Sequence, residues 1–294
     1  MNRQRRAMSM CLCGVPLAAL GVSASAQECG AVLGVGGPSG ATKLVSADQV
    51  ERAAAQQYLQ LKQGAIEKRA LAPATHPQLI RLRAIADRLV PLAADCNPRA
   101  RGWQWEVNLL GSNQINAFCM PGGKIAFFTG ILERLHLTDD EVAMVMGHEI
   151  AHATQEHARE RMGKNFATRG AIEIGSALLG LGSGGRMLAD IGGELLTLKY
   201  GRDDESEADK IGLVLAARAG YDPRAGVTLW QKMGTSNKGA PPEFISTHPS
   251  GPTRIKDIED SLPKVEPLYE RAAKPARRFE PAAPKAAPAS GARG

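Results

Sequence analysis

The stretch from Thr138 to Met162 constrains the fold of this chain more than any other. Its start favours a helix, because Thr138 can act as the N-cap and Glu141 follows three residues later, which completes a capping box. Three consecutive acids in the first turn also favour a helix, since they face the positive end of the helix dipole. Gly163 is the predicted stop, so the sequence predicts one continuous helix across the whole stretch.

This predicted helix contains the pattern His148-Glu149-Ile150-Ala151-His152. Residues four apart lie on one face of a helix, so His148 and His152 can bind one metal ion from adjacent turns. Glu149 lies beside them and can hold a water on that ion, as the general base of a zinc hydrolase does. His157 comes nine residues after His148, and at about 100° per residue it faces the opposite side. We interpret His157 as a solvated surface histidine.

A third metal ligand is expected in the acidic segment from Arg202 to Asp209, since catalytic zinc sites usually have three protein ligands. On a helix Glu205 and Asp209 share a face, whereas Glu207 lies about 200° away from Glu205. Glu205 can therefore reach the metal, and Asp209 can hydrogen-bond a ligand histidine or the reacting oxygen. The alternative is a solvated acidic helix start.

Taken together, these two motifs resemble the zinc metallopeptidases related to the CAAX prenyl protease and the HtpX heat-shock protease. The chain matches that family further in three segments, Asn116-Ala117-Phe118 with Pro121-Gly122-Gly123, Tyr200-Gly201-Arg202, and Ser246-Thr247-His248-Pro249 with Arg254. In the second segment the family usually has Ser-Arg, so the serine is missing here and the arginine is kept. The resemblance covers about Asp48 to Ser261.

The resemblance implies a zincin-like fold in which one Zn²⁺ per chain is bound by His148, His152 and Glu205. It also implies that Glu149 is the general base and that Asp209 is a proton donor or an orienting acid.

For His248 two roles remain open. It can take the fourth zinc position, so that the enzyme rests inactive, or it can donate to the reaction intermediate while Arg254 holds its loop. We favour the first role.

The pattern along the chain predicts an α+β fold that is mainly helical, with a small antiparallel sheet beside the zinc-site helix. An extended substrate is expected along the strand Gln114–Cys119, whose edge offers unpaired backbone groups. The expected strands are Trp103–Leu110, Gln114–Cys119 and Lys124–Thr129, and the other expected helices are Asp48–Glu67, His76–Ala94, Asp203–Ala219, Gly226–Met233 and Thr253–Ser261.

Four regions are expected. Residues 1–26 have early arginines, an apolar run and Ala24-Ser25-Ala26, and they are typical of a cleaved signal peptide. Residues 27–47 are expected to be a flexible leader, residues 48–265 the metallopeptidase domain and residues 266–294 a disordered Ala/Pro-rich tail. An exported chain with Cys29, Cys96 and Cys119 can form one disulfide and keep one thiol, but the sequence does not choose the pair.

Without the first 26 residues the net charge falls from +6 to +3 (33 basic minus 30 acidic residues), which is too small to indicate nucleic-acid binding. The chain is most similar to the periplasmic beta-barrel-assembly-enhancing protease group, although it is too short for that group's helical-repeat domain. We therefore expect a zinc endopeptidase of the bacterial periplasm that cuts misfolded or stalled exported proteins. Contact with the outer-membrane assembly machinery and peripheral membrane association are left open. The alternative is a chaperone-like binding protein that rarely cuts.

Overall fold

The computed structural model describes residues 29–165, 199–236, 243–248 and 252–283. The predicted signal peptide, residues 1–26, lies outside these ranges. Within the described ranges, no helix combines the length and the apolar character that crossing a bilayer would require.

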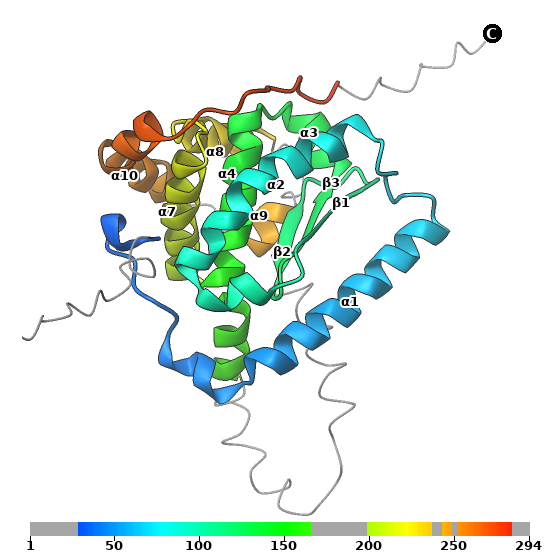
Figure 1. The fold of residues 1–294 in the computed structure, drawn as a ribbon, viewed down its shortest axis with the longest axis horizontal. Coiled ribbons are helices and arrows are strands. Elements are labelled where there is room, and N and C mark those ends of the chain that lie inside the picture. Colours follow the sequence, from blue (N-terminus) through cyan, green and yellow to red (C-terminus); the bar gives the residue numbers. More distant parts are fainter. Residues whose placement is uncertain (1–28, 166–198, 237–242, 249–251, 284–294) are drawn as a thin grey trace, which may run out of the picture.

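The fold is built around helix α4 (Asp139–Thr154), which lies between α2 (Pro77–Cys96), α7 (Arg202–Arg218) and a small sheet (Figure 1). Every residue of α4 except Asp140 is buried. A helix that is covered on all sides must lie at the centre of its domain. Its start is the predicted capping box, because Thr138 Oγ1 accepts from Glu141 N and the Glu141 side chain accepts from Thr138 N.

The sheet has three strands in the order β1-β3-β2, namely β1 (Glu106–Leu110), β2 (Ala117–Met120) and β3 (Lys124–Phe128). Strands β2 and β3 are antiparallel, as predicted, and are joined by a tight turn in which Gly122 and Gly123 have positive φ. Strand β1 pairs with the other side of β3 and runs parallel to it, so the sheet is mixed and the predicted antiparallel pairing holds only for β2 and β3. Because β3 pairs with β1 on one side and with β2 on the other, β2 lies at an edge of the sheet.

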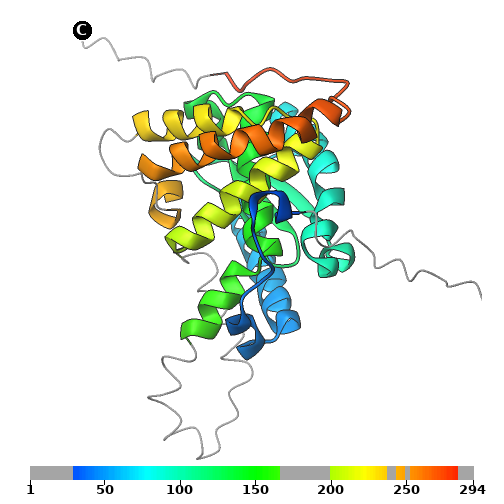
Figure 2. The ribbon, with the colours of Figure 1, turned by 90° about the vertical axis from the view of Figure 1, so that its left-hand side faces the viewer.

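The remaining helices confirm the mainly helical α+β prediction. Helix α1 lies along the sheet in Figure 1, and the Tyr58 hydroxyl on it donates to Ile125 O at 2.5 Å. Figure 2 shows α8 and α10 side by side above α7. The bounds of these helices are α1 Ala47–Glu67, α3 Thr129–Leu135, α8 Ala225–Thr235, α9 Glu243–Thr247 and α10 Pro252–Arg271, with short 3₁₀ turns at Ala31–Leu33, Gly40–Leu44 and Pro98–Gly102.

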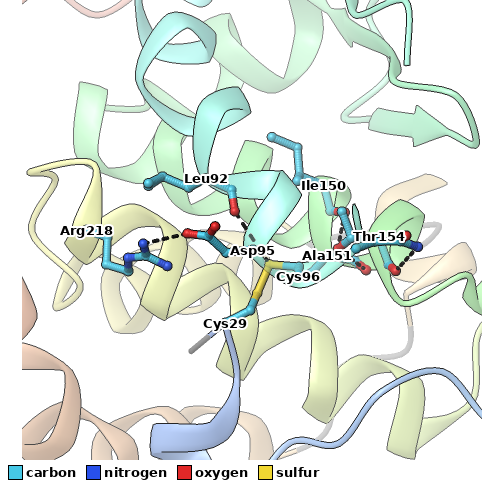
Figure 3. Close-up of a disulfide and its surroundings, with 9 residues drawn as sticks. Cys29, Leu92, Asp95, Cys96, Ile150, Ala151, Thr154 and Arg218 are labelled. Carbon is cyan, nitrogen blue, oxygen red and sulfur yellow. Dashed lines mark hydrogen bonds and ion pairs between the residues drawn. A yellow bond between two sulfur atoms is a disulfide. The ribbon is translucent and has the colours of Figure 1, made fainter. Parts of the chain in front are cut away.

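The expectation of a flexible leader is wrong for its residues from Cys29 onward. Cys29 forms a disulfide with Cys96 at the end of α2 (Figure 3). Leu33 is buried against the core. The free thiol is Cys119, which is buried.

The expectation of a disordered tail is wrong for residues 266–283. Helix α10 continues to Arg271, well beyond the predicted end at Ser261. The chain then crosses the top of the molecule in extended form (Figures 1 and 2). There Phe279 N donates to Asp139 Oδ2 at 2.8 Å, and Ala282 is buried. These contacts with the first turn of α4 hold a segment whose composition alone suggests no order. Residues 284–294 lie outside the described ranges.

The helix of the His-Glu-x-x-His pattern is shorter than predicted, since α4 ends at Thr154 and not near Gly163. Asn97 Nδ2 donates to Thr154 O at 2.9 Å, which satisfies a carbonyl at the helix end. Glu156 has a φ of 58°, in the left-handed region, and so turns the chain. A second helical segment then runs over residues 157–165.

Candidate metal centre

Two glycines set the distance between the helices that carry the candidate ligands. An ideal Cβ on Gly212 of α7 would lie 2.9 Å from His148 N, and one on Gly147 of α4 would lie 3.0 Å from Gly212 O. The two backbones are therefore in direct contact, which any larger residue at these positions would prevent. This close crossing brings Glu205 and Asp209 against the histidines of α4.

Four buried side chains converge at this crossing, His148, His152, Glu205 and His248, each with a ligating atom within 4.8 Å of the others. His148 Nε2 lies 3.1 Å from His152 Nε2 and 3.3 Å from His248 Nδ1. One nitrogen that faces two others can share a proton with only one of them, whereas a cation can accept all three lone pairs. Imidazole nitrogens with a carboxylate are also the donors that zinc prefers. The residues therefore fit a metal ion.

Glu149 lies next to the four donors and is also buried. Within the described part of the chain its Oε1 has no hydrogen-bond partner, and His248 Nε2 is 3.5 Å away. Burial raises the pKa of the Glu149 carboxyl, and this outweighs the lowering by the charges of His248 and His148. A carboxylate with a raised pKa and a free oxygen is suited to take a proton from a water.

Asp209 and Arg254 contact the candidate ligands but are not among the four donors. Asp209 Oδ1 is 3.0 Å from His148 Nδ1, and Arg254 donates to both Asp209 and Glu205 at 2.7 Å. Burial would raise the pKa of Asp209, but the Arg254 charge and the His148 hydrogen bond outweigh it and lower the pKa. Of the two predicted roles for Asp209, this geometry supports the orienting one. Arg254 also stacks on Trp230, with its guanidinium carbon 3.6 Å from the ring centroid.

His248 directly follows the short helix α9 and lies outside it. Its backbone N donates to Phe244 O at 2.8 Å, and its ring stacks on Phe244 with centroids 4.5 Å apart. His248 Nδ1 lies 3.0 Å from Glu205 Oε1. Burial alone would lower the pKa of His248, but the Glu149 charge and the Glu205 hydrogen bond raise it above its usual value.

Sequence reasoning missed two side chains at the centre. His157 was expected in solvent, but it is 1% exposed and its Nδ1 lies 2.9 Å from His152 Nδ1. The helix break turns His157 back toward the site, so the angle calculated for a continuous helix does not apply. Tyr200 stacks on His152, with ring centroids 3.9 Å apart. Its place two residues before Arg202 was the only signal in the sequence.

A cavity of about 40 Å³ opens beside Glu149, enough for one or a few waters. Strand β2, Tyr200 and His248 contribute to its lining. The lining residues that belong to β2 and its ends are Asn116, Ala117, Phe118, Cys119, Met120 and Pro121.

A helix that carries paired histidines and a carboxylate, a second helix that adds an acid, and an edge strand beside them define the zincin class. The model of peptidase family M48 matches residues 78–262. The chain belongs to this family.

Among the relatives, the mitochondrial metalloendopeptidase OMA1 of Arabidopsis thaliana is 40% identical over 159 residues, which are 53% of this chain and 31% of the relative. The OMA1 metalloendopeptidase of Schizosaccharomyces pombe is 33% identical over 197 residues, 66% and 56% of the two chains. The beta-barrel assembly-enhancing protease of Escherichia coli O157:H7 is 31% identical over 170 residues, 54% and 35%. The chain thus spans less than two thirds of the length of each of these relatives.

Proposed function

We propose that this protein is a zinc-dependent endopeptidase. The observation that carries the proposal is the group of four buried donors with a free carboxylate oxygen of Glu149 beside them. His148, His152 and Glu205 are the proposed permanent ligands. Membership of a peptidase family and relatives that are named metalloendopeptidases support the same activity.

Each residue of the candidate site has a defined task in the proposed hydrolysis of a peptide bond. A zinc ion held by these residues would supply Lewis-acid chemistry for a water and for the peptide carbonyl. Glu149 is positioned to take a proton from a water and to give it to the leaving amine. Asp209 accepts from His148 Nδ1 and so holds the ring with Nε2 toward the metal. Arg254 keeps Glu205 and Asp209 together and compensates their buried charge.

His248 is the proposed fourth ligand of the resting enzyme. Its Nδ1 lies within the donor group, so on a bound metal it would take the position that a water needs. Cleavage then requires that His248 leaves this position. This supports the first of its two predicted roles.

Substrate is proposed to bind as an added strand on β2. Phe128 N donates to Asn116 O at 3.1 Å, and backbone groups alternate in direction along a strand. Ala117 and Cys119 therefore direct their backbone groups to the free edge, beside the cavity that Glu149 lines. Strand addition uses main-chain hydrogen bonds, so such a site accepts many sequences but needs an extended, unfolded segment.

The proposal is tested by digestion of casein and of a stably folded protein of similar size, with zinc content measured in parallel. We expect wild type to contain zinc and to cut casein but not the folded protein. Glu149→Gln should keep zinc and lose activity by roughly 10²- to 10⁴-fold, because only the base is removed. A fully active Glu149→Gln protein would mean that another residue is the base.

We further propose that the protein acts in the bacterial periplasm on misfolded or stalled exported proteins. The signal-like pattern of residues 1–26 supports export, and the Cys29–Cys96 disulfide suits an oxidising compartment. The relative from Escherichia coli is named a beta-barrel assembly-enhancing protease, which suggests the outer-membrane assembly machinery as a partner. The alternative is a chaperone-like protein, which would bind casein and zinc with little cleavage.

A further inference from the structure

His157 contacts the proposed metal ligand His152 on the ring edge that faces away from the other donors. It comes from the helical segment 157–165, which begins just after the turn at Glu156. Its Nδ1 lies 2.9 Å from Nδ1 of His152, and its Nε2 lies 3.4 Å from Glu207 Oε2. His157 is buried, while the Glu207 side chain is 43% exposed.

The contacts of His152 and His157 determine which ring nitrogen of each histidine carries the proton. His152 Nε2 faces the donor group, 3.1 Å from His148 Nε2, and it needs a lone pair to bind a metal. The proton of the neutral ring is then on Nδ1, which must donate to an acceptor. The atom at hydrogen-bond distance is His157 Nδ1, so His157 carries its own proton on Nε2, toward the Glu207 carboxylate.

We propose that His157 is a positioning residue of the metal centre, which accepts the Nδ1 hydrogen of His152 and thereby holds the Nε2 lone pair of His152 toward the metal. The inference rests on the proposed zinc site. It assigns to His157 the task that Asp209 performs for His148. Outer hydrogen-bond partners of this kind fix the tautomer and orientation of a ligand ring.

The break after α4 makes this arrangement possible. In a continuous helix His157 would lie on the far side from His148. The turn at Gln155 and Glu156 reverses this, and Tyr200 stacks on one face of the His152 ring. His152 is therefore held by a hydrogen bond at one edge and by stacking on its plane.

Two substitutions separate hydrogen bonding from packing. His157→Asn keeps an acceptor oxygen near the position of Nδ1, whereas His157→Phe keeps a ring but has no acceptor. Zinc affinity is measured at one pH by competition with a chelator, and folding by circular dichroism. We expect His157→Phe to bind zinc 10- to 100-fold more weakly than wild type, and His157→Asn less than 10-fold more weakly. The matched control is His76→Gln, at the N-cap of α2, which should keep wild-type zinc affinity.

A folded His157→Phe protein with wild-type zinc affinity would overturn the proposal, and so would equal losses in His157→Asn and His157→Phe. If wild type itself bound no zinc, the proposed zinc endopeptidase function would fail too. Failure of the His157 proposal alone would instead leave zinc binding by wild type intact.

A measurement on wild type covers the case in which the variants do not fold. In the zinc-loaded protein with ¹⁵N-labelled histidine, we expect a coupling between the two Nδ1 atoms across the hydrogen bond, with the proton on His152. A proton on His157 Nδ1, or no coupling between the two assigned rings, would refute the assignment.

Discussion

Glu205 and Glu207 lie two residues apart on α7, but only Glu205 faces the histidines. Glu205 is buried, and hydrogen bonds from His152 and His248 outweigh the effect of burial and lower its pKa. Glu205→Ala should therefore remove stoichiometric zinc, as should substitution of His148 or His152 by Ala. Glu207→Ala should keep it. Metal analysis of the purified proteins checks this, and normal zinc in Glu205→Ala would refute the ligand assignment.

The proposed role of His248 as the fourth ligand predicts the direction in which its removal changes the rate of cleavage. If it occupies the fourth position at rest, His248→Ala frees that position for water and should raise the rate of casein digestion at unchanged zinc content. A lower rate at unchanged zinc would instead support a role in donating to the intermediate. A rate equal to wild type would reject both roles. The control is Thr247→Ala, which also lines the cavity but offers no imidazole.

At this scale the sequence predicted the candidate ligands from helix geometry, because residues four apart lie on one face in any α-helix. It could not place His157, whose position depends on a helix end that Asn97 stabilises from a distant part of the chain. Nor could it show that Arg254 pairs with both acids, since this contact joins residues 45 and 49 positions apart. Tertiary contacts of this kind leave no pattern in the local sequence.

At the scale of elements, the crossing of α4 and α7 depends on the absence of side chains at Gly147 and Gly212. Alanine normally stabilises a helix interior relative to glycine by roughly 0.5–1 kcal/mol. Gly212→Ala should do the opposite, because its Cβ would meet the backbone of His148 at 2.9 Å and force the helices apart. We expect a loss of about 1–3 kcal/mol in the free energy of unfolding, together with weaker zinc binding.

The control for this prediction is Gly64→Ala in α1, where an added Cβ would meet nothing within 4 Å. This variant should be as stable as wild type or slightly more so, with unchanged zinc affinity. Chemical denaturation and chelator competition measure both quantities. Equal behaviour of the two variants would show that the glycine contact does not set the site.

From regular apolar spacing the sequence predicted α1, α2, α7 and α8 to within a few residues, but it did not predict α3 or α9, and it misplaced the ends of α4 and α10. Its error in the sheet has a physical cause. The pattern of alternating residues identifies strands, but it does not say which strands pair. Strand β1 pairs with β3 although β2 lies between them in the sequence, and β2 is left at the edge of the sheet. The helix end at Arg271 was missed because Pro263 and Pro267 lie inside α10.

At the scale of the whole molecule, the Cys29–Cys96 disulfide ties the N-terminal segment to α2 across 67 residues. A cross-link of this span lowers the entropy of the unfolded chain, which stabilises the fold by about 4 kcal/mol in the simple loop-closure model. Cys29→Ser should lower the free energy of unfolding by up to that amount. Denaturant titration with and without a reductant measures the effect.

In the same experiment, reductant should destabilise wild type to the level of Cys29→Ser and leave the variant unchanged. A wild-type protein whose stability did not respond to complete reduction would contradict the prediction.

The metal centre joins distant parts of the chain, and this governs when a growing chain acquires it. The ribosome delivers His148 and His152 long before His248, which is 100 residues beyond His148. Arg254 emerges later still, 49 residues after Glu205, and until then the two acids lack the cation that neutralises them. A chain interrupted before Arg254 therefore carries the His-Glu-x-x-His helix without a completed metal centre.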